Sequence, residues 1–276
     1  MGILIGFDET PYGLDALALG LQLAGETGEP VTVATAFPDD ERGLIVASQD
    51  RRWLNEVRAV AEAKLDAARE AVAGRPDVEF VPLGPASASR ALHQYAEKTK
   101  PYAIVVGSSE HSAIGRISPG STVERLLHGA PCPVAVAPRG YRRRAQPIRS
   151  IAVAYDGTQE ADEALAVAAR VAGRVEATVR LVVVASEDEQ GASSLVGAAA
   201  ERLAGAVKVS SEVVRDEDVV EALADLPGEH PDLLVCGSRG YGPLKQILLG
   251  SVSTQLIRKA AYPVLVVPRP AQAAGH

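Results

Sequence analysis

Short apolar runs rich in Val, Ile and Leu alternate along the chain with longer segments in which apolar residues recur at helical spacing. The runs lack a regular apolar–polar alternation, which is typical of parallel strands that helices cover on both faces. We predict strands at residues 3–7, 31–36, 78–82, 103–107, 133–137, 150–154, 178–184, 207–214, 232–236 and 263–267. Helices are predicted at residues 12–26, 50–73, 87–99, 120–129, 159–172, 191–205, 217–226 and 251–260. This alternation predicts an α/β fold with doubly wound parallel sheets.

The same series of blocks occurs twice in the chain. Residues 3–10, 103–109, 119–123 and 130–138 resemble residues 151–158, 233–239, 249–253 and 261–268, in the same order. Such a repeat predicts two copies of one domain. We therefore expect two parallel five-stranded sheets of the Rossmann-like type. Their domains are predicted at residues 1–140 and 148–270, joined by a basic linker at 141–147.

The last strand of each copy poses a packing problem. Residues 133–137 and 263–267 are apolar, have proline beside them, and would each lie at a sheet edge. An unpaired apolar edge strand promotes association with other chains. We predict that the two strands pair with each other, so that the copies form a pseudo-two-fold pair within one chain.

Composition narrows the classes of partner. Hydrophobic residues make up 47% of the chain and charged residues 23%, as in ordinary globular proteins, and the formal net charge is −7. An acidic chain is a poor non-specific ligand for nucleic acid, so no nucleic-acid partner is expected. The basic cluster at residues 142–144 is interpreted as a solvated linker, and a site for an acidic partner is the alternative.

Cysteine, histidine and hydropathy patterns indicate no metal site and no membrane span. Cys132 and Cys236 are predicted to be buried, reduced thiols, and the histidines lack metal-ligand spacing. No apolar run approaches the length of a membrane span, so we expect no membrane partner and a cytoplasmic location.

One loop carries the pattern of an anion site. Gly237-Ser238-Arg239-Gly240 ends a predicted strand, and after nine residues Gly250-Ser251-Val252-Ser253 opens a predicted helix. Glycines let a phosphate approach the main chain, and a helix N-terminus offers unpaired N–H donors. Taken singly, Gly237 and Gly240 could only shape a turn and Ser251 could only cap a helix. The complete spacing between a strand and a helix favours a phosphate site.

The same spacing resembles the ATP-binding motif of the universal stress protein family. The resemblance covers almost the whole chain and implies a tandem member with two such domains. It implies that Gly237, Gly240, Gly250 and their neighbours Arg239, Ser251, Val252 and Ser253 hold phosphates. It further implies that Asp156, which follows Ala154 at the first strand, holds the ribose and that main chain near Val184 holds adenine. The implied ligand is ATP, ADP or AMP, with Mg²⁺ as a possible companion of the phosphates.

The first copy departs from this motif at one position. Glu110 follows Gly107-Ser108-Ser109 where the motif has glycine, although the spacing to the next glycine and its two hydroxyl residues is kept. A carboxylate there would repel a polyphosphate by about 1–4 kcal/mol, and it lacks glycine's freedom at positive φ. We therefore expect the first copy to be the weaker site. The counterpart positions are Gly6, Asp8, Ala36, Gly107, Ser109, Gly120, Ser121 and Thr122.

These observations favour an adenine-nucleotide-binding stress-response sensor or regulator, which acts mainly through its second domain. No general base is evident, so ATP hydrolysis would at most be slow and the chain is not expected to be an enzyme. One alternative is a dimerisation or partner-docking module that binds no nucleotide, and a homodimer is compatible with either interpretation. An enzyme of the wider adenine-nucleotide α-hydrolase-like group is disfavoured, because its loop and histidine motifs are missing.

Overall fold

The fold is an α/β arrangement of ten strands and eight α-helices in the computed structural model, which describes residues 2–37, 51–72, 75, 77–109, 120–238 and 251–268. The first half contains β1 Ile3–Gly6, α1 Pro11–Thr27, β2 Val31–Phe37, α2 Arg51–Ala71, β3 Val78–Pro85, α3 Ala88–Thr99, β4 Ala103–Gly107, α4 Ser121–Gly129 and β5 Val134–Ala137. A single 3-10 turn, η1 Tyr141–Arg143, follows. The second half contains β6 Ser150–Ala154, α5 Gln159–Val175, β7 Thr178–Ala185, α6 Glu189–Leu203, β8 Lys208–Arg215, α7 Val219–Ala224, β9 Leu233–Gly237, α8 Ser251–Lys259 and β10 Val264–Val267.

All ten strands form one continuous sheet in the order β3-β2-β1-β4-β5-β10-β9-β6-β7-β8. Each half is a parallel, doubly wound five-stranded unit, as the sequence predicts. The two units meet at β5 and β10, which pair antiparallel with Ala135 opposite Leu265. The predicted pairing of the two last strands is therefore confirmed, and it leaves neither strand at an edge.

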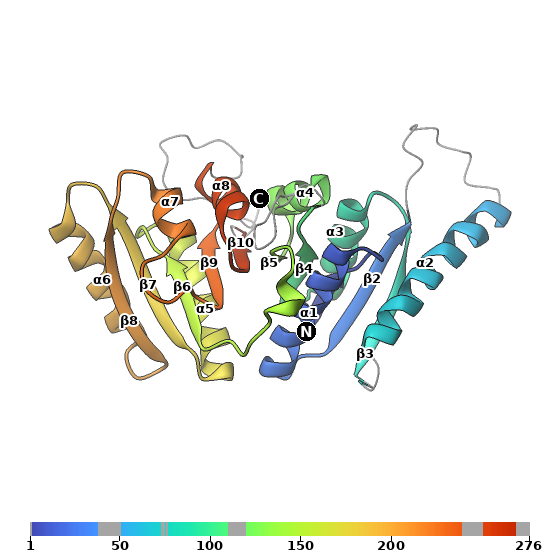
Figure 1. Cartoon of the computed structure of the whole chain (residues 1–276), viewed down its shortest axis with the longest axis horizontal. Helices are drawn as coiled ribbons and strands as arrows, with labels where there is room; N and C mark the ends of the chain where they lie inside the picture. The colour runs from blue at the N-terminus through green and yellow to red at the C-terminus, as the bar shows by residue number, and fades with distance from the viewer. Residues whose placement is uncertain are drawn as a thin grey trace, which may run out of the picture.

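Two apolar layers fill the space between the sheet and its helices. One layer contains side chains from α1, α2, α5 and α6, and the other contains side chains from α3, α4, α7 and α8. Each layer extends across both halves of the chain, and Figure 1 shows the corresponding helices on opposite sides of the sheet. The halves thus share their core, which fixes their relative positions.

The first helix of each half begins with the same device. Thr10 is the N-cap of α1 and accepts a hydrogen bond from the Gly13 amide, and Thr158 caps α5 by accepting from the Ala161 amide. A threonine that caps a helix in this way stabilises it by about 1 kcal/mol. The repeated sequence therefore produces repeated helix starts beside the carboxyl ends of β1 and β6.

Candidate functional site

The switch point of the second half lies between β6 and β9. β6 pairs with β7 on one side and with β9 on the other. Connections from β6 and β9 leave towards opposite faces, since α5 and α8 belong to different core layers. Open α/β sheets bind ligands in the crevice at such a point, beyond the carboxyl ends of the strands. Asp156 follows β6 there and Gly237 ends β9.

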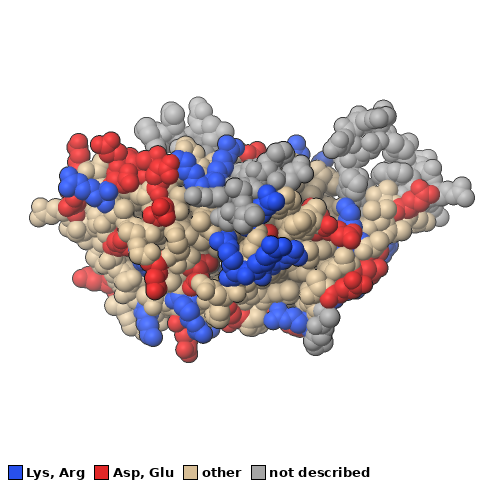
Figure 2. All heavy atoms as spheres, viewed as in Figure 1, with Lys and Arg blue, Asp and Glu red and all other residues tan. Residues whose placement is uncertain are grey.

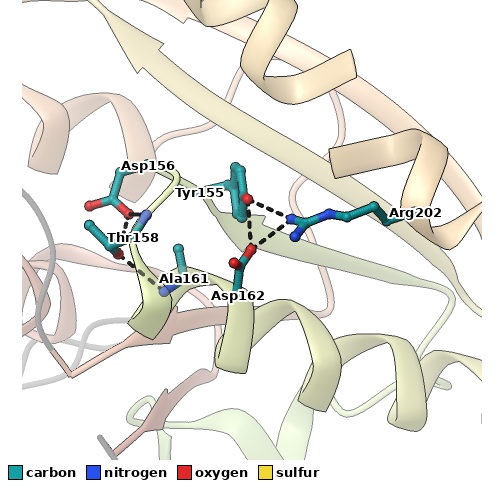
Figure 3. Close-up of polar contacts among 6 residues, drawn as sticks. All are labelled: Tyr155, Asp156, Thr158, Ala161, Asp162 and Arg202. Carbon is teal, nitrogen blue, oxygen red and sulfur yellow. Dashed lines mark hydrogen bonds and ion pairs between the residues drawn. The ribbon is translucent and has the colours of Figure 1, made fainter. Parts of the chain in front are cut away.

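The turn after β6 holds the Asp156 carboxylate in a fixed position (Figure 3). Its Oδ1 accepts hydrogen bonds from the Thr158 amide at 3.1 Å and from the Thr158 hydroxyl at 2.6 Å. The Thr158 oxygen in turn accepts from the Ala161 amide at 3.2 Å. The carboxylate is half-buried and its second oxygen, Oδ2, points away from this turn. Asp156 is thus ordered by the helix cap beside it.

The end of β9 and the start of α8 are joined by a buried hydrogen bond. The Ser253 hydroxyl donates to the Ser238 carbonyl oxygen at 3.2 Å, and both serines are buried. This bond brings together the two flanks of residues 239–250. Ser253 stands where the first copy has the buried Val123, so its position faces the core. The structure gives Ser253 a part in joining α8 to the end of β9, and contact with a phosphate stays a prediction.

Gly237 has a packing role in the structure. A Cβ atom at this position would lie 2.9 Å from both the Cβ and the carbonyl oxygen of Glu160 in the first turn of α5. Gly107, its counterpart after β4, is tighter still, because a Cβ there would lie 2.1 Å from the Tyr12 carbonyl oxygen. The first glycine of the motif is therefore required by the close approach of the helix to the end of the strand.

Four of the other residues predicted for the second site lie in the described part of the chain, and three do not. Ala154 ends β6 and is buried, Val184 lies buried on β7, and Val252 is half-buried in the first turn of α8. Ser251 is the first residue of α8. Arg239, Gly240 and Gly250 lie outside the described residues, so their roles stay predictions.

The first half repeats this arrangement with differences. The Asp8 Oδ1 accepts from the Thr10 hydroxyl at 2.5 Å. Gly6 and Gly107 end their strands, Ala36 lies on β2, Ser109 follows β4, and Gly120, Ser121 and Thr122 form the cap and start of α4. Glu110 lies outside the described residues. Glu124 in the first turn of α4 places a carboxylate near the helix N-terminus, whereas the first turn of α8 contains no acidic residue.

A polar network in the second half was not foreseen from the sequence (Figure 3). The Tyr155 hydroxyl donates to the Asp162 carboxylate at 2.7 Å, and Arg202 donates to both groups at 2.6 Å. Burial raises the pKa of Tyr155, while the hydrogen bond from Arg202 lowers the pKa of Asp162. The aligned positions in the first copy are Phe7 and Leu14. This difference between an apolar pair and a polar pair at aligned positions is the sequence signal that could have revealed the network. The network connects α6 to the turn that carries Asp156.

Acidic side chains lie on the outer part of the second half. Exposed carboxylates gather at the turns after β7 and β8, at Glu187, Asp188, Glu189, Asp216 and Glu217. Figure 2 shows acidic side chains at the end of the molecule that α6 and β8 occupy in Figure 1. An anion at this edge of the sheet is therefore repelled from the outer turns and attracted to the start of α8.

Both cysteines lie in the interior of the fold. Cys132 and Cys236 are buried free thiols, as predicted, and burial raises the pKa of each to about 12. Within the described ranges, no group of His, Cys, Asp and Glu side chains is placed to hold a metal ion. None of the helices in the described part of the chain combines the length and the apolar character that a membrane span requires.

Comparisons with known proteins place this geometry in a family. The model of the universal stress protein family matches residues 1–138 and again residues 147–268. A universal stress protein of Mycobacterium tuberculosis is 25% identical over 292 residues, covering 97% of this chain and 100% of that protein. A universal stress protein of Mycolicibacterium smegmatis is 32% identical over 186 residues, covering 59% of this chain and 60% of that protein.

Solved structures share the fold over almost the whole chain. The crystal structure of a universal stress protein from Archaeoglobus fulgidus superimposes with a TM-score of 0.76 at 23% identity, covering 97% of this chain and 98% of that chain. Two successive matches to one family model, in the two halves that share this fold, account for the sequence repeat. The chain belongs to the universal stress protein family, as a tandem member with two copies of the family domain.

Proposed function

We propose that this protein binds an adenine nucleotide at the switch point of its second half and acts as a sensor or regulator in a stress response. The observation that carries the proposal is the Ser253–Ser238 hydrogen bond. It holds the start of α8, which has no acidic residue in its first turn, next to the end of β9. The amides at that helix start are donors for a phosphate.

The predicted residues would contact the parts of the ligand in the order that the family resemblance implies. Phosphates would lie against the start of α8, with Gly240 and Gly250 admitting them to the main chain. The ordered Asp156 carboxylate has an oxygen that can accept from ribose hydroxyls, and the end of β7 near Val184 would face adenine. A Mg²⁺ ion would depend mainly on phosphate oxygens, because the described residues supply no carboxylate cluster for it.

The first half is the weaker site in this proposal. Glu124 in the first turn of α4 opposes an anion at that helix N-terminus. A charge at a helix terminus changes the interaction by about 0.3–1 kcal/mol, and a carboxylate at Glu110 adds its own repulsion. These effects together correspond to a difference in affinity of roughly tenfold or more.

Titration calorimetry with ATP, using the full chain, tests the proposal. We expect one strong site per chain, and Gly250→Asp should abolish it because a carboxylate would stand at the start of α8. The reciprocal variant Glu110→Gly should strengthen a second, weaker binding event and leave the strong site unchanged. Gly129→Ala, at an open position away from both loops, is the control.

Three results would refute the proposal or its asymmetry. Absence of binding to ATP, ADP and AMP would reject nucleotide binding and favour a partner-docking module. Unchanged affinity in Gly250→Asp would reject the assigned loop. Two equal sites in the unaltered protein would reject the difference between the halves.

A further inference from the structure

The pseudo-two-fold arrangement creates two equivalent grooves beside the central helices α1 and α5. Helices α1 and α5 contact each other next to the β5–β10 pair. Each groove has on its rim two polar residues of one of these helices and one residue from the turn before a strand of the other half. The linker groove is bordered by Gln22, Glu26 and Asp232, and the open groove by Arg170, Arg174 and Tyr102. Alignment of the repeats makes these two sets of three residues equivalent, in that order.

The linker groove is filled by the segment that connects the halves. Tyr141 donates to the Gln22 side chain at 2.7 Å, and the Ile148 amide donates to the Glu26 carboxylate at 3.1 Å. Gln146 donates to Asp232 at 2.9 Å. Ile148 is fully buried and belongs, with Tyr141, to the core layer of α1 and α5. This groove therefore binds a peptide segment through one aliphatic anchor and several polar contacts.

The open groove has no such segment among the described residues. It contains a cavity of about 60 Å³ whose apolar lining comes mainly from α1, α5 and three strands; the lining includes Ile3, Leu23, Ala103, Val167, Val171 and Leu265. A single water molecule requires roughly 10–15 Å³ by this measure. The cavity can therefore admit an aliphatic side chain. It corresponds to the place of Ile148 in the linker groove, because Arg174, which lines the cavity, is equivalent to Glu26, which accepts from the Ile148 amide.

The charges of the two grooves are opposite. Where the linker groove has the acceptors Gln22, Glu26 and Asp232, the open groove has two arginines and a tyrosine. Arg174 pairs with Glu29 at one end of the open groove. Arg170 is exposed, stacks at 5.8 Å over the Tyr102 ring, and has no acidic partner within the described ranges. An occupant of the open groove must therefore offer acceptors, and carboxylates suit Arg170 best.

We propose that the open groove docks a segment of a partner protein, in which an aliphatic residue is flanked by acidic residues. The segment enters as residues 145–148 of the linker enter the equivalent groove. Its later residues turn to solvent, because Gly2, whose carbonyl oxygen accepts from the Tyr102 amide, already occupies the place equivalent to Ser150. Its aliphatic side chain fills the cavity, and its carboxylates pair with Arg170 at the rim. This function is separate from nucleotide binding, because the groove lies at the amino ends of β1 and β4, away from the switch points.

Fluorescence polarisation with a labelled peptide tests the proposal on the full chain. The probe is Ala-Glu-Pro-Ile-Asp-Ser, which is residues 145–150 with carboxylates in place of Gln146 and Arg149. We expect saturable binding that weakens about tenfold in Arg170→Glu, through loss of one ion pair and gain of repulsion. Arg142→Glu, a change at another exposed arginine, should leave binding unaltered.

Two altered probes separate specific docking from general attraction of charges. A basic probe with Lys in place of both carboxylates, and an acidic probe with Ser in place of Ile, should each bind at least about tenfold more weakly. Equal binding of all three probes, or no effect of Arg170→Glu, would overturn the proposal. Binding that appears only after removal of residues 269–276 would assign the groove to that segment of the chain instead of a partner.

Discussion

Asp15 in α1 attaches the segment that follows β5 to the first half of the chain. Its replacement gives the sharpest test of how the two halves are joined. Its side chain is 1% exposed, although it is a carboxylate. Oδ2 accepts from the Gly140 amide at 2.6 Å and Oδ1 from the Arg142 amide at 3.0 Å. Both oxygens therefore bind the 3-10 turn at the start of the linker.

The decrease in the free energy of unfolding that Asp15→Ala causes can be estimated from these two hydrogen bonds. A hydrogen bond to a charged group contributes about 1.5–3 kcal/mol, so two bonds give an upper limit of about 3–6 kcal/mol. Gly140 and Arg142 are not fully buried, so water can replace part of the loss. We expect a decrease of about 2–4 kcal/mol in the free energy of unfolding. Asp15→Asn keeps one acceptor and should cost about half as much.

Urea unfolding followed by far-ultraviolet circular dichroism measures these differences. Glu163→Ala is the matched control, because Glu163 occupies the equivalent position in α5 and makes no hydrogen bond or ion pair with the linker within the described part of the chain. That variant should lie within about 0.5 kcal/mol of the unaltered protein. If Asp15→Ala also lies within that range, the buried carboxylate does not hold the linker and the reasoning is wrong.

Three further predictions concern the glycine at the end of β4, the two cysteines and the carboxylate of Asp162. Gly107→Ala should destabilise by about 2–3 kcal/mol in urea unfolding, because its Cβ would lie 2.1 Å from a main-chain oxygen of α1, while Gly129→Ala, with nothing within 4 Å, should be neutral. Cys132 and Cys236 should resist iodoacetamide at pH 8 in the folded protein and react after denaturation, because burial raises the pKa of each to about 12; rapid labelling of the native state would contradict this. Asp162→Asn should cost about 1 kcal/mol or less at pH 7, and this difference should disappear as the pH falls below the unfolded carboxyl pKa and through the lowered pKa of Asp162; a difference independent of pH would refute it.

The tandem architecture could be predicted from the sequence because its causes are local or repeated. Apolar runs and helical periods specified the elements, and the repeat placed them twice in the same order. Pairing of β5 with β10 was also predictable, since two apolar edge strands in one chain are best satisfied by each other. Glycine spacing located the switch point, although Arg239, Gly240 and Gly250 lie outside the described residues.

Other features depend on contacts that no local pattern contains. Gly237 could be connected with Glu160 only after α5 was packed against the end of β9. The linker was expected to be solvated, and the side chains at 142–144 are indeed exposed. However, Tyr141 at its start and Ile148 just after its end are buried, in a groove that exists only between the halves. The sequence by itself determined the repeated domain, its parallel doubly wound sheets and the pairing of the two last strands. Tertiary structure alone decided that the one linker fills one of two equivalent grooves, because a single connection cannot obey a two-fold symmetry.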